Sequence, residues 1–140
     1  MRRTERFEGR IGRTIAESEP WFDEPPHPGE DAPDVVVVLL DDTGFAQLGC
    51  YGSDIATPHI DALAGAGLRY TNFHVTPLCS PTRASLLTGR NPHAVGMRVV
   101  SNFQTGFPNQ KAHISNHAAT MAEVLGDAGY ATFCVGKWHL

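Results

Sequence analysis

The feature that most constrains this fold is the apolar run VVVVLL, which extends from Val35 to Leu40. Four β-branched residues followed by two leucines, with no polar residue between them, are typical of a strand that is buried on both faces of a parallel sheet. The run is far too short to cross a bilayer as a helix. It therefore predicts a central strand over residues 35–40.

Strand and helix patterns alternate after this run. Leu68 to Val75 and Ala131 to Val135 have the composition of further strands. Helix signals lie between them, as N-cap residues, N-terminal prolines and closing glycines. The predicted helices run from Thr57-Pro58 to Gly65 or Gly67, from Ser80-Pro81 to Gly89, and from the capping box Thr120–Glu123 to about Gly129. This order predicts an α/β fold with a largely parallel sheet flanked by helices.

The rest of the chain is polar or lacks a clear period. Residues 1–33 are polar and rich in proline, which indicates an extended N-terminal arm. Residues 34–140 are predicted to form one domain, in which 91–117 are mostly loop. A formal net charge of −4 argues against a nucleic-acid partner, since such proteins are normally basic.

Cysteine content and the N-terminus bear on location. Three cysteines without paired spacing do not form a disulfide framework, so a reducing compartment is expected. Cys50 and Cys134 are interpreted as packed thiols. No apolar segment follows Met1-Arg2-Arg3, so we expect no secretory signal, no membrane association and a cytoplasmic location.

Three groups of reactive side chains each follow a predicted strand. They are Asp41-Asp42, the segment from Cys79 to Arg83, and the segment from Lys137 to His139. In an open parallel sheet, ligands bind outside the carboxyl ends of the strands. The sequence therefore predicts one site to which all three groups contribute.

Each group has a chemical interpretation and a structural alternative. Asp41 and Asp42 suit a hard cation such as Ca²⁺ or Mg²⁺, or they cap a turn. Cys79 lies before Ser80, a good N-cap residue, where helix N–H groups favour an anion, with Arg83 one turn further on. This position suits an activated nucleophile, and the alternative is a buried structural cysteine. Lys137 and His139 either face a common anion or are a solvated lysine and a packed histidine.

The wider motifs resemble a known family. Cys79-Ser-Pro-Thr-Arg83 followed by Leu-Thr-Gly-Arg90 is similar to the signature of type I sulfatases, the formylglycine-dependent enzymes that include the arylsulfatases. The Asp41-Asp42 region resembles their metal-binding opening. Gly136-Lys-Trp-His-Leu140 resembles another sulfatase element. The resemblance implies an alkaline-phosphatase-like fold, of which residues 34–140 are an N-terminal portion.

It also implies a mechanism. A formylglycine-generating enzyme would oxidise Cys79 to the aldehyde, whose hydrate supplies the hydroxyl that attacks the sulfur of a small-molecule sulfate ester. Asp41, Asp42 and residue 79 would bind a divalent metal, usually Ca²⁺, with Mg²⁺ as the alternative. Arg83 and Lys137 would neutralise sulfate oxygens, and His139 would help to deprotonate the hydrate. The implied function is that of a sulfuric ester hydrolase of the arylsulfatase type.

Sulfatases are several times longer than this chain, so the resemblance implies a truncated sheet. We expect these residues alone to bind metal poorly and to turn over little substrate. One alternative is a phosphonate monoester or phosphodiester hydrolase that uses the same aldehyde and metal. The other is a non-catalytic fragment that keeps the fold without maturation of Cys79.

Overall fold

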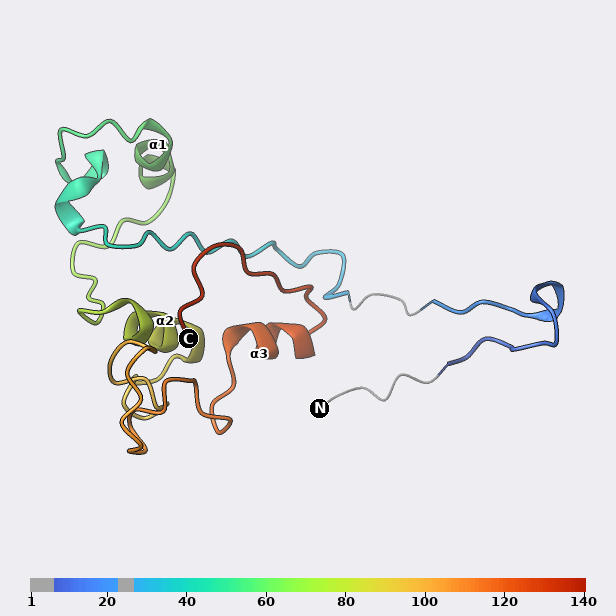
Figure 1. The fold of residues 1–140 in the computed structure, drawn as a ribbon. Helices are drawn as coiled ribbons and strands as arrows, with labels where there is room; N and C mark the ends of the chain where they lie inside the picture. The colour runs from blue at the N-terminus through green and yellow to red at the C-terminus, as the bar shows by residue number, and fades with distance from the viewer. Residues whose placement is uncertain (1–6, 23–26) are drawn as a thin grey trace.

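A computed structural model describes residues 7–22 and 27–140. Its helices are α1 (Pro58–Ala66), α2 (Cys79–Thr88) and α3 (Met121–Asp127). Single 3₁₀ turns occur at Ile15–Glu17, Phe45–Gln47 and Gly49–Tyr51. Figure 1 shows α2 and α3 beside one another, with α1 in a separate lobe, and long extended segments between them.

The three predicted helices are confirmed, and local signals explain most of their ends. Thr57 occupies the N-cap position of α1, Pro58 is its first residue and Gly67 is its C-cap. Gly89 ends α2 in the left-handed conformation (φ 64°), and its N–H donates to the carbonyl of Ser85 at 2.8 Å. Glycine adopts this conformation without the steric cost that a side chain brings.

The α3 helix starts with the predicted capping box. The N–H of Glu123 donates to Oγ1 of Thr120 at 3.3 Å, and the N–H of Thr120 donates to Oε2 of Glu123 at 2.7 Å. Oγ1 of Thr120 also donates to Oε2 of Glu123 at 2.9 Å. The backbone and side-chain donors of Thr120 hold the pKa of Glu123 below its ordinary value of 4.5, because they favour the charged carboxylate.

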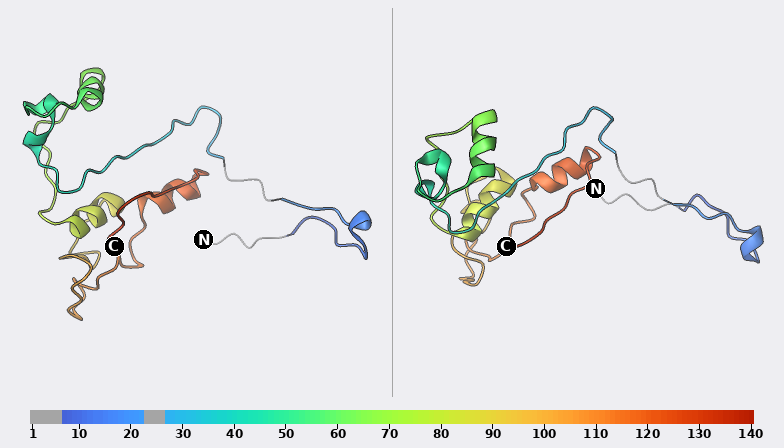
Figure 2. Two further views of the ribbon diagram at one scale, coloured as in Figure 1. Left: turned by 45° about the horizontal axis from the view of Figure 1, so that its top comes forward. Right: turned by 90° about the horizontal axis from the view of Figure 1, so that it is seen from above.

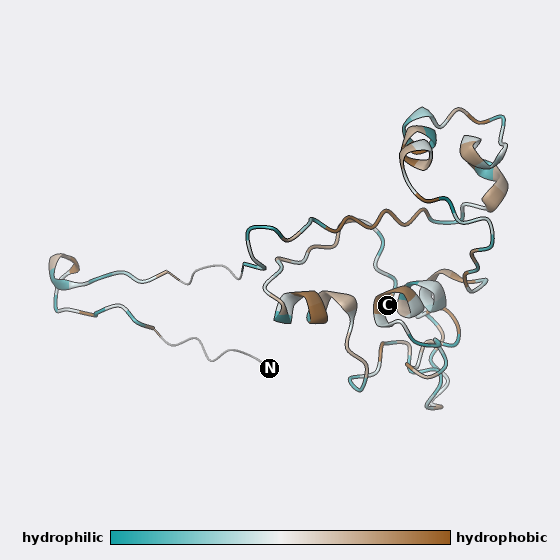
Figure 3. Ribbon diagram, turned by 180° about the vertical axis from the view of Figure 1, so that it is seen from behind, coloured by the Kyte–Doolittle hydropathy of each residue, from teal (hydrophilic) through white to brown (hydrophobic). Residues whose placement is uncertain are grey.

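The predicted sheet is not formed in the structure. No strand occurs within residues 7–22 and 27–140, and Val36 and Val135 are 82% and 97% exposed. The segments 35–40 and 131–135 have no regular secondary structure, 68–75 bends at residues 71–72, and no backbone hydrogen bond joins any two of the three. A strand needs a partner for its backbone groups. These segments have no such partner among the described residues, and Figure 3 shows the hydrophobic colour along residues 35–40.

The core is small and lies beside α2. Its buried members are Ala84, Val95, Met97 and Ala118, and Ile114 and Leu140 pack against them. Three of these residues, Val95, Met97 and Ile114, come from the region 91–117, which was predicted to be mostly loop. One isolated antiparallel bridge, Met97 with Gln110, joins two parts of that loop. Packing, not regular secondary structure, therefore fixes the surroundings of α2.

The described part of the N-terminal arm extends away from the helices (Figure 2). An isolated antiparallel bridge joins Arg10 and Glu19, whose side chains also form an exposed ion pair at 3.2 Å. Residues 1–6 and 23–26 of the predicted arm lie outside the described residues. The division of the chain at residue 33 stays a prediction.

Candidate functional site

The site is built on the first turn of α2. This helix begins at Cys79, with Leu78 in the N-cap position, so the prediction of Ser80 as N-cap is wrong. The reason is a tertiary hydrogen bond, because Oγ of Ser80 donates to the carbonyl of His139 at 2.6 Å. Cys79 is consequently the first helical residue, where backbone N–H groups have no partner within the helix.

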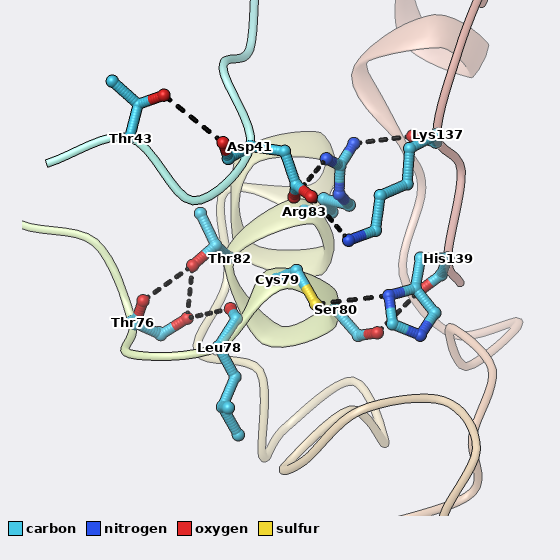
Figure 4. A network of polar contacts seen from close by, with 10 residues as sticks. All are labelled: Asp41, Thr43, Thr76, Leu78, Cys79, Ser80, Thr82, Arg83, Lys137 and His139. Atoms are coloured by element: carbon cyan, nitrogen blue, oxygen red, sulfur yellow. Dashed lines mark hydrogen bonds and ion pairs between the residues drawn. The ribbon is translucent and has the colours of Figure 1, made fainter.

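A carboxylate joins two cations from distant parts of the chain (Figure 4). Oδ1 of Asp41 accepts from Nη2 of Arg83 at 3.0 Å, and Oδ2 accepts from Nζ of Lys137 at 2.7 Å. Nη1 of Arg83 also donates to the carbonyl of Lys137 at 2.6 Å. The side chain of Arg83 is only 11% exposed, so α2 holds this guanidinium in a fixed place.

The contacts explain two pKa shifts. The hydrogen bonds from Lys137 and then Arg83 hold the pKa of Asp41 below its ordinary value of 3.8. The hydrogen bond to Asp41 raises the pKa of Lys137 above 10.5. Asp41 and Lys137 are therefore charged at neutral pH, and the carboxylate lies between two cationic side chains.

Cys79 lies in a second set of contacts. Its Sγ is 3.2 Å from Nδ1 of His139, and Nε2 of the same ring is 2.9 Å from Oδ1 of Asn102. His139 has a positive φ of 55°, a left-handed backbone that is uncommon for a residue with a side chain. The imidazole thus connects the first residue of α2 with the loop that contains Asn102.

A cavity of about 320 Å³ adjoins both sets of contacts. Asp41, Asp42, Cys79 and Arg83 are among the residues that line it. The structure therefore brings all of the predicted site residues to one end of α2. Asp42 lines the shared cavity, and the other residues contact one another directly.

The oxygen atoms that line the cavity suit a hard cation. They are too few to form a complete metal site by themselves. Two aspartates beside residue 79 provide oxygen ligands of the kind that Ca²⁺ and Mg²⁺ prefer. Within residues 7–22 and 27–140, no three His, Cys, Asp or Glu side chains are close enough together to hold a metal ion. Both oxygens of Asp41 also contact cationic side chains, so this carboxylate lies where positive charge is favoured.

Two residues beside the site were not found from the sequence. Asn102 contacts His139, and Gln110, which is fully buried, binds the loop around Asn102. Both belong to the region 91–117, whose composition shows no period, so the sequence offered no signal for either of them. The interpretation of Cys134 as a packed thiol is also wrong, because this residue is exposed in a segment that forms no strand.

None of the helices among the described residues combines the length and the apolar character that a membrane span requires. The three cysteines are free.

The known proteins that this chain resembles are sulfatases. The Sulfatase family model matches residues 33–140. An uncharacterised sulfatase of Schizosaccharomyces pombe is 39% identical over 115 residues, which are 77% of this chain and 21% of that protein. Human arylsulfatase A is 44% identical over 113 residues, covering 77% of this chain and 21% of the relative. Human steryl-sulfatase is 41% identical over 113 residues, with 77% and 19% covered.

The chain thus spans about a fifth of the length of these curated relatives. The matched range contains α1, α2, α3 and every residue of the site described above. The chain belongs to the Sulfatase family.

Proposed function

We propose that this protein acts in the hydrolysis of sulfate esters, as a sulfuric ester hydrolase of the arylsulfatase type that uses a formylglycine formed from Cys79. The observation that carries the proposal is the meeting of Cys79, Arg83, Lys137 and His139 at the first turn of α2. These residues come from two segments that are far apart in the sequence, and family membership explains why they converge.

The two cations provide the anion-binding part of the site. Arg83 and Lys137 both reach the carboxylate of Asp41, so their donors converge closely enough to share one anionic group. A sulfate group presents several oxygens to the same donors, and charge-assisted hydrogen bonds to such oxygens stabilise the charge that develops during displacement. Arg83 and Lys137 are therefore the proposed sulfate ligands.

Asp41, Asp42 and the oxygen of a converted residue 79 are the proposed protein ligands of Ca²⁺, with Mg²⁺ as the alternative. When bound, such a cation would polarise the sulfate oxygens as a Lewis acid. These three ligands are fewer than the six to eight oxygens that Ca²⁺ normally takes. For this reason we expect weak metal binding and low turnover by these 140 residues alone.

One hydroxyl of the formylglycine hydrate would attack sulfur, break the bond between sulfur and the ester oxygen, and expel the alcohol or phenol. Deprotonation of the second hydroxyl would re-form the aldehyde as sulfate leaves. His139 is the proposed acceptor of that proton, because its Nδ1 is the ring atom next to Cys79. An ordinary serine or cysteine lacks the second hydroxyl. The role of His139 is that of a general base.

The substrate class and the partner are also proposals. Relatives named arylsulfatase and steryl-sulfatase support aryl or steryl sulfate esters as small-molecule substrates. A formylglycine-generating enzyme is the proposed maturation partner. Three free cysteines support a reducing, cytoplasmic location for the chain.

The test has two steps. The chain is expressed with and without a formylglycine-generating enzyme, and the tryptic peptide from Tyr70 to Arg83 is analysed by mass spectrometry. We expect conversion of Cys79 to the aldehyde only with the enzyme. Hydrolysis of 4-nitrophenyl sulfate is then compared with that of 4-nitrophenyl phosphate.

Cys79→Ala should abolish sulfate ester hydrolysis, and the matched change Cys134→Ala at an exposed cysteine should leave it unaltered. Preference for the phosphate ester would support the phosphohydrolase alternative. A thiol that stays unconverted, or a converted chain without any ester hydrolysis, would contradict the proposal.

A further inference from the structure

The hydrogen bond between His139 and Asn102 determines which nitrogen of the imidazole faces residue 79. An amide oxygen only accepts hydrogen bonds, so Nε2 of His139 must carry a hydrogen and donate it to Oδ1 of Asn102 at 2.9 Å. A neutral imidazole has one N–H. Its other nitrogen, Nδ1, is therefore left with a free lone pair, and this atom lies 3.2 Å from Sγ of Cys79.

Asn102 is itself held in place by a buried glutamine. Oε1 of Gln110 accepts from the N–H of Val99 at 2.8 Å, and Nε2 of Gln110 donates to the carbonyls of Val100, at 3.3 Å, and Phe103. Gln110 has no exposed surface. These bonds fix the backbone on both sides of Asn102, although the Asn102 side chain is exposed.

Ser80 connects the same loop to α2. Its hydroxyl oxygen accepts from the N–H of Ser101 at 3.2 Å and donates to the carbonyl of His139 at 2.6 Å. Ser80 is completely buried. The backbone of His139 and the loop next to Asn102 are thus joined to one residue of the helix that begins with Cys79.

We propose that Asn102 is a positioning residue that fixes the Nε2–H tautomer of His139 and so directs the Nδ1 lone pair at residue 79. This inference rests on the proposed function, because it explains why the base in that mechanism is ready to accept a proton. In a ring without this partner the hydrogen exchanges between both nitrogens, and the fraction that carries it on Nδ1 cannot accept from residue 79.

The test compares variants at Asn102 that remove the hydrogen-bond acceptor with one that keeps it. Asn102→Leu removes the acceptor, Asn102→Ala removes it without added bulk, and Asn102→Asp keeps an acceptor at the same position. The matched control is Asn72→Leu, because Oδ1 of Asn72 lies 2.7 Å from Nε2 of His74 in another exposed His–Asn pair. All variants are made in the full chain.

The first readout is the ¹⁵N spectrum of the His139 ring at a pH where the imidazole is neutral. In the unaltered chain and in Asn102→Asp we expect distinct signals for a protonated Nε2 and an unprotonated Nδ1. In Asn102→Leu and Asn102→Ala the two signals should move toward one another as the tautomers mix. Asn72→Leu should leave the His139 signals unchanged.

The second readout is 4-nitrophenyl sulfate hydrolysis by the formylglycine-converted protein. For a histidine that binds a metal, loss of the partner that orients the ring typically costs about 10- to 100-fold in metal affinity or activity, and this range guides the expectation for His139. We expect a loss in this range for Asn102→Leu, with recovery in Asn102→Asp. A purely structural role would not be rescued by the retained acceptor.

The two proposals fail in different ways. If Asn102→Leu and Asn102→Ala leave both the tautomer and the turnover unaltered, Asn102 is not a positioning residue and the proposed function stands. If the tautomer depends on Asn102 but the converted protein cleaves no sulfate ester, the positioning role stands and the proposed function is wrong.

Discussion

Helices α2 and α3 begin in opposite ways. The first turn of α3 is completed by its own capping box, since Thr120 and Glu123 satisfy one another's backbone donors. The first turn of α2 has no side-chain cap. The side chains of Cys79, Ser80 and Arg83 instead contact residues that lie between 21 and 60 positions away in the sequence. Thr82 bonds to Thr76, six positions away.

The start of α3 stabilises that helix alone, whereas the start of α2 brings the residues of the candidate site together. A helix that caps itself needs nothing from the rest of the chain to start at the right residue. In α2, the side chains of Ser80 and Arg83 bind distant partners and do not cap the helix. Its first turn therefore brings reactive groups together but lacks the stabilisation that a side-chain cap provides. If this view is correct, changes at α2 should act on remote residues, whereas changes at α3 should stay local.

The largest effect is expected from Arg83→Met. This change removes the guanidinium that contacts Asp41 and the carbonyl of Lys137, while it keeps a long apolar side chain. Hydrogen bonds of a charged group contribute about 1.5–3 kcal/mol, so the free energy of unfolding should fall by about 2 kcal/mol in urea titrations. NMR signals of Asp41 and Lys137 should shift as well.

Arg90→Met is the control for this prediction. Arg90 is an exposed arginine just beyond the end of the same helix, and its replacement should alter the unfolding free energy by less than about 0.5 kcal/mol. Equal losses for the two variants would mean that α2 gains nothing from its distant partners.

A smaller effect is expected from Gln110→Leu. The variant leaves the N–H of Val99 and the carbonyls of Val100 and Phe103 without their side-chain partner. Unsatisfied buried groups cost about 1–3 kcal/mol, and we expect a loss near 1.5 kcal/mol, since part of this loop becomes hydrated. Amide exchange should accelerate in residues 99–103 and stay unchanged in α3.

Gln104→Leu provides the comparison, because Gln104 is exposed and makes a single long hydrogen bond of 3.4 Å to the carbonyl of Lys111. It should have almost no effect. Faster exchange throughout α3 in Gln110→Leu would contradict the separation of the two regions.

The sequence predicted the features that depend on neighbouring residues. Capping at Thr120, the helix start at Pro58 and the helix end at Gly89 all follow from interactions within a few residues. The site residues were found in another way, because the motif around Cys79 and the Gly-Lys-Trp-His-Leu tract resemble a family. The structure brings these residues to one end of α2, and their roles stay predictions.

Features that depend on distant partners were predicted less well. The run from Val35 to Leu40 has the composition of a buried strand, yet a strand forms only where another backbone pairs with it. Ser80 has the composition of an N-cap, but His139 provides a partner that the local pattern cannot reveal. Asn102 and Gln110 act through tertiary contacts in a loop without periodicity, and so no sequence rule identified them.

The smallest of the predicted losses in stability is that of Thr120→Ala. Removing an N-cap side chain typically costs about 1 kcal/mol, which corresponds to roughly fivefold faster amide exchange in α3. Exchange in α2 and the contacts of Asp41 should stay as they are. Thr71→Ala, at an exposed threonine outside the helices, should change neither helix.

The effect of Thr120→Ala should also depend on pH in a direction that the capping box determines. The bonds from Thr120 lower the pKa of Glu123 below 4.5, so they favour the folded state while the carboxylate is charged. A lowered folded pKa contributes stability that is present above the unfolded pKa and is lost as pH falls through the folded pKa. The exchange difference between Thr120→Ala and the unaltered chain should therefore be largest near neutral pH and shrink as pH falls below 4.5. A difference that stayed constant down to about pH 3 would mean that the hydroxyl of Thr120 acts without Glu123, and that α3 is capped by one residue and not by a pair.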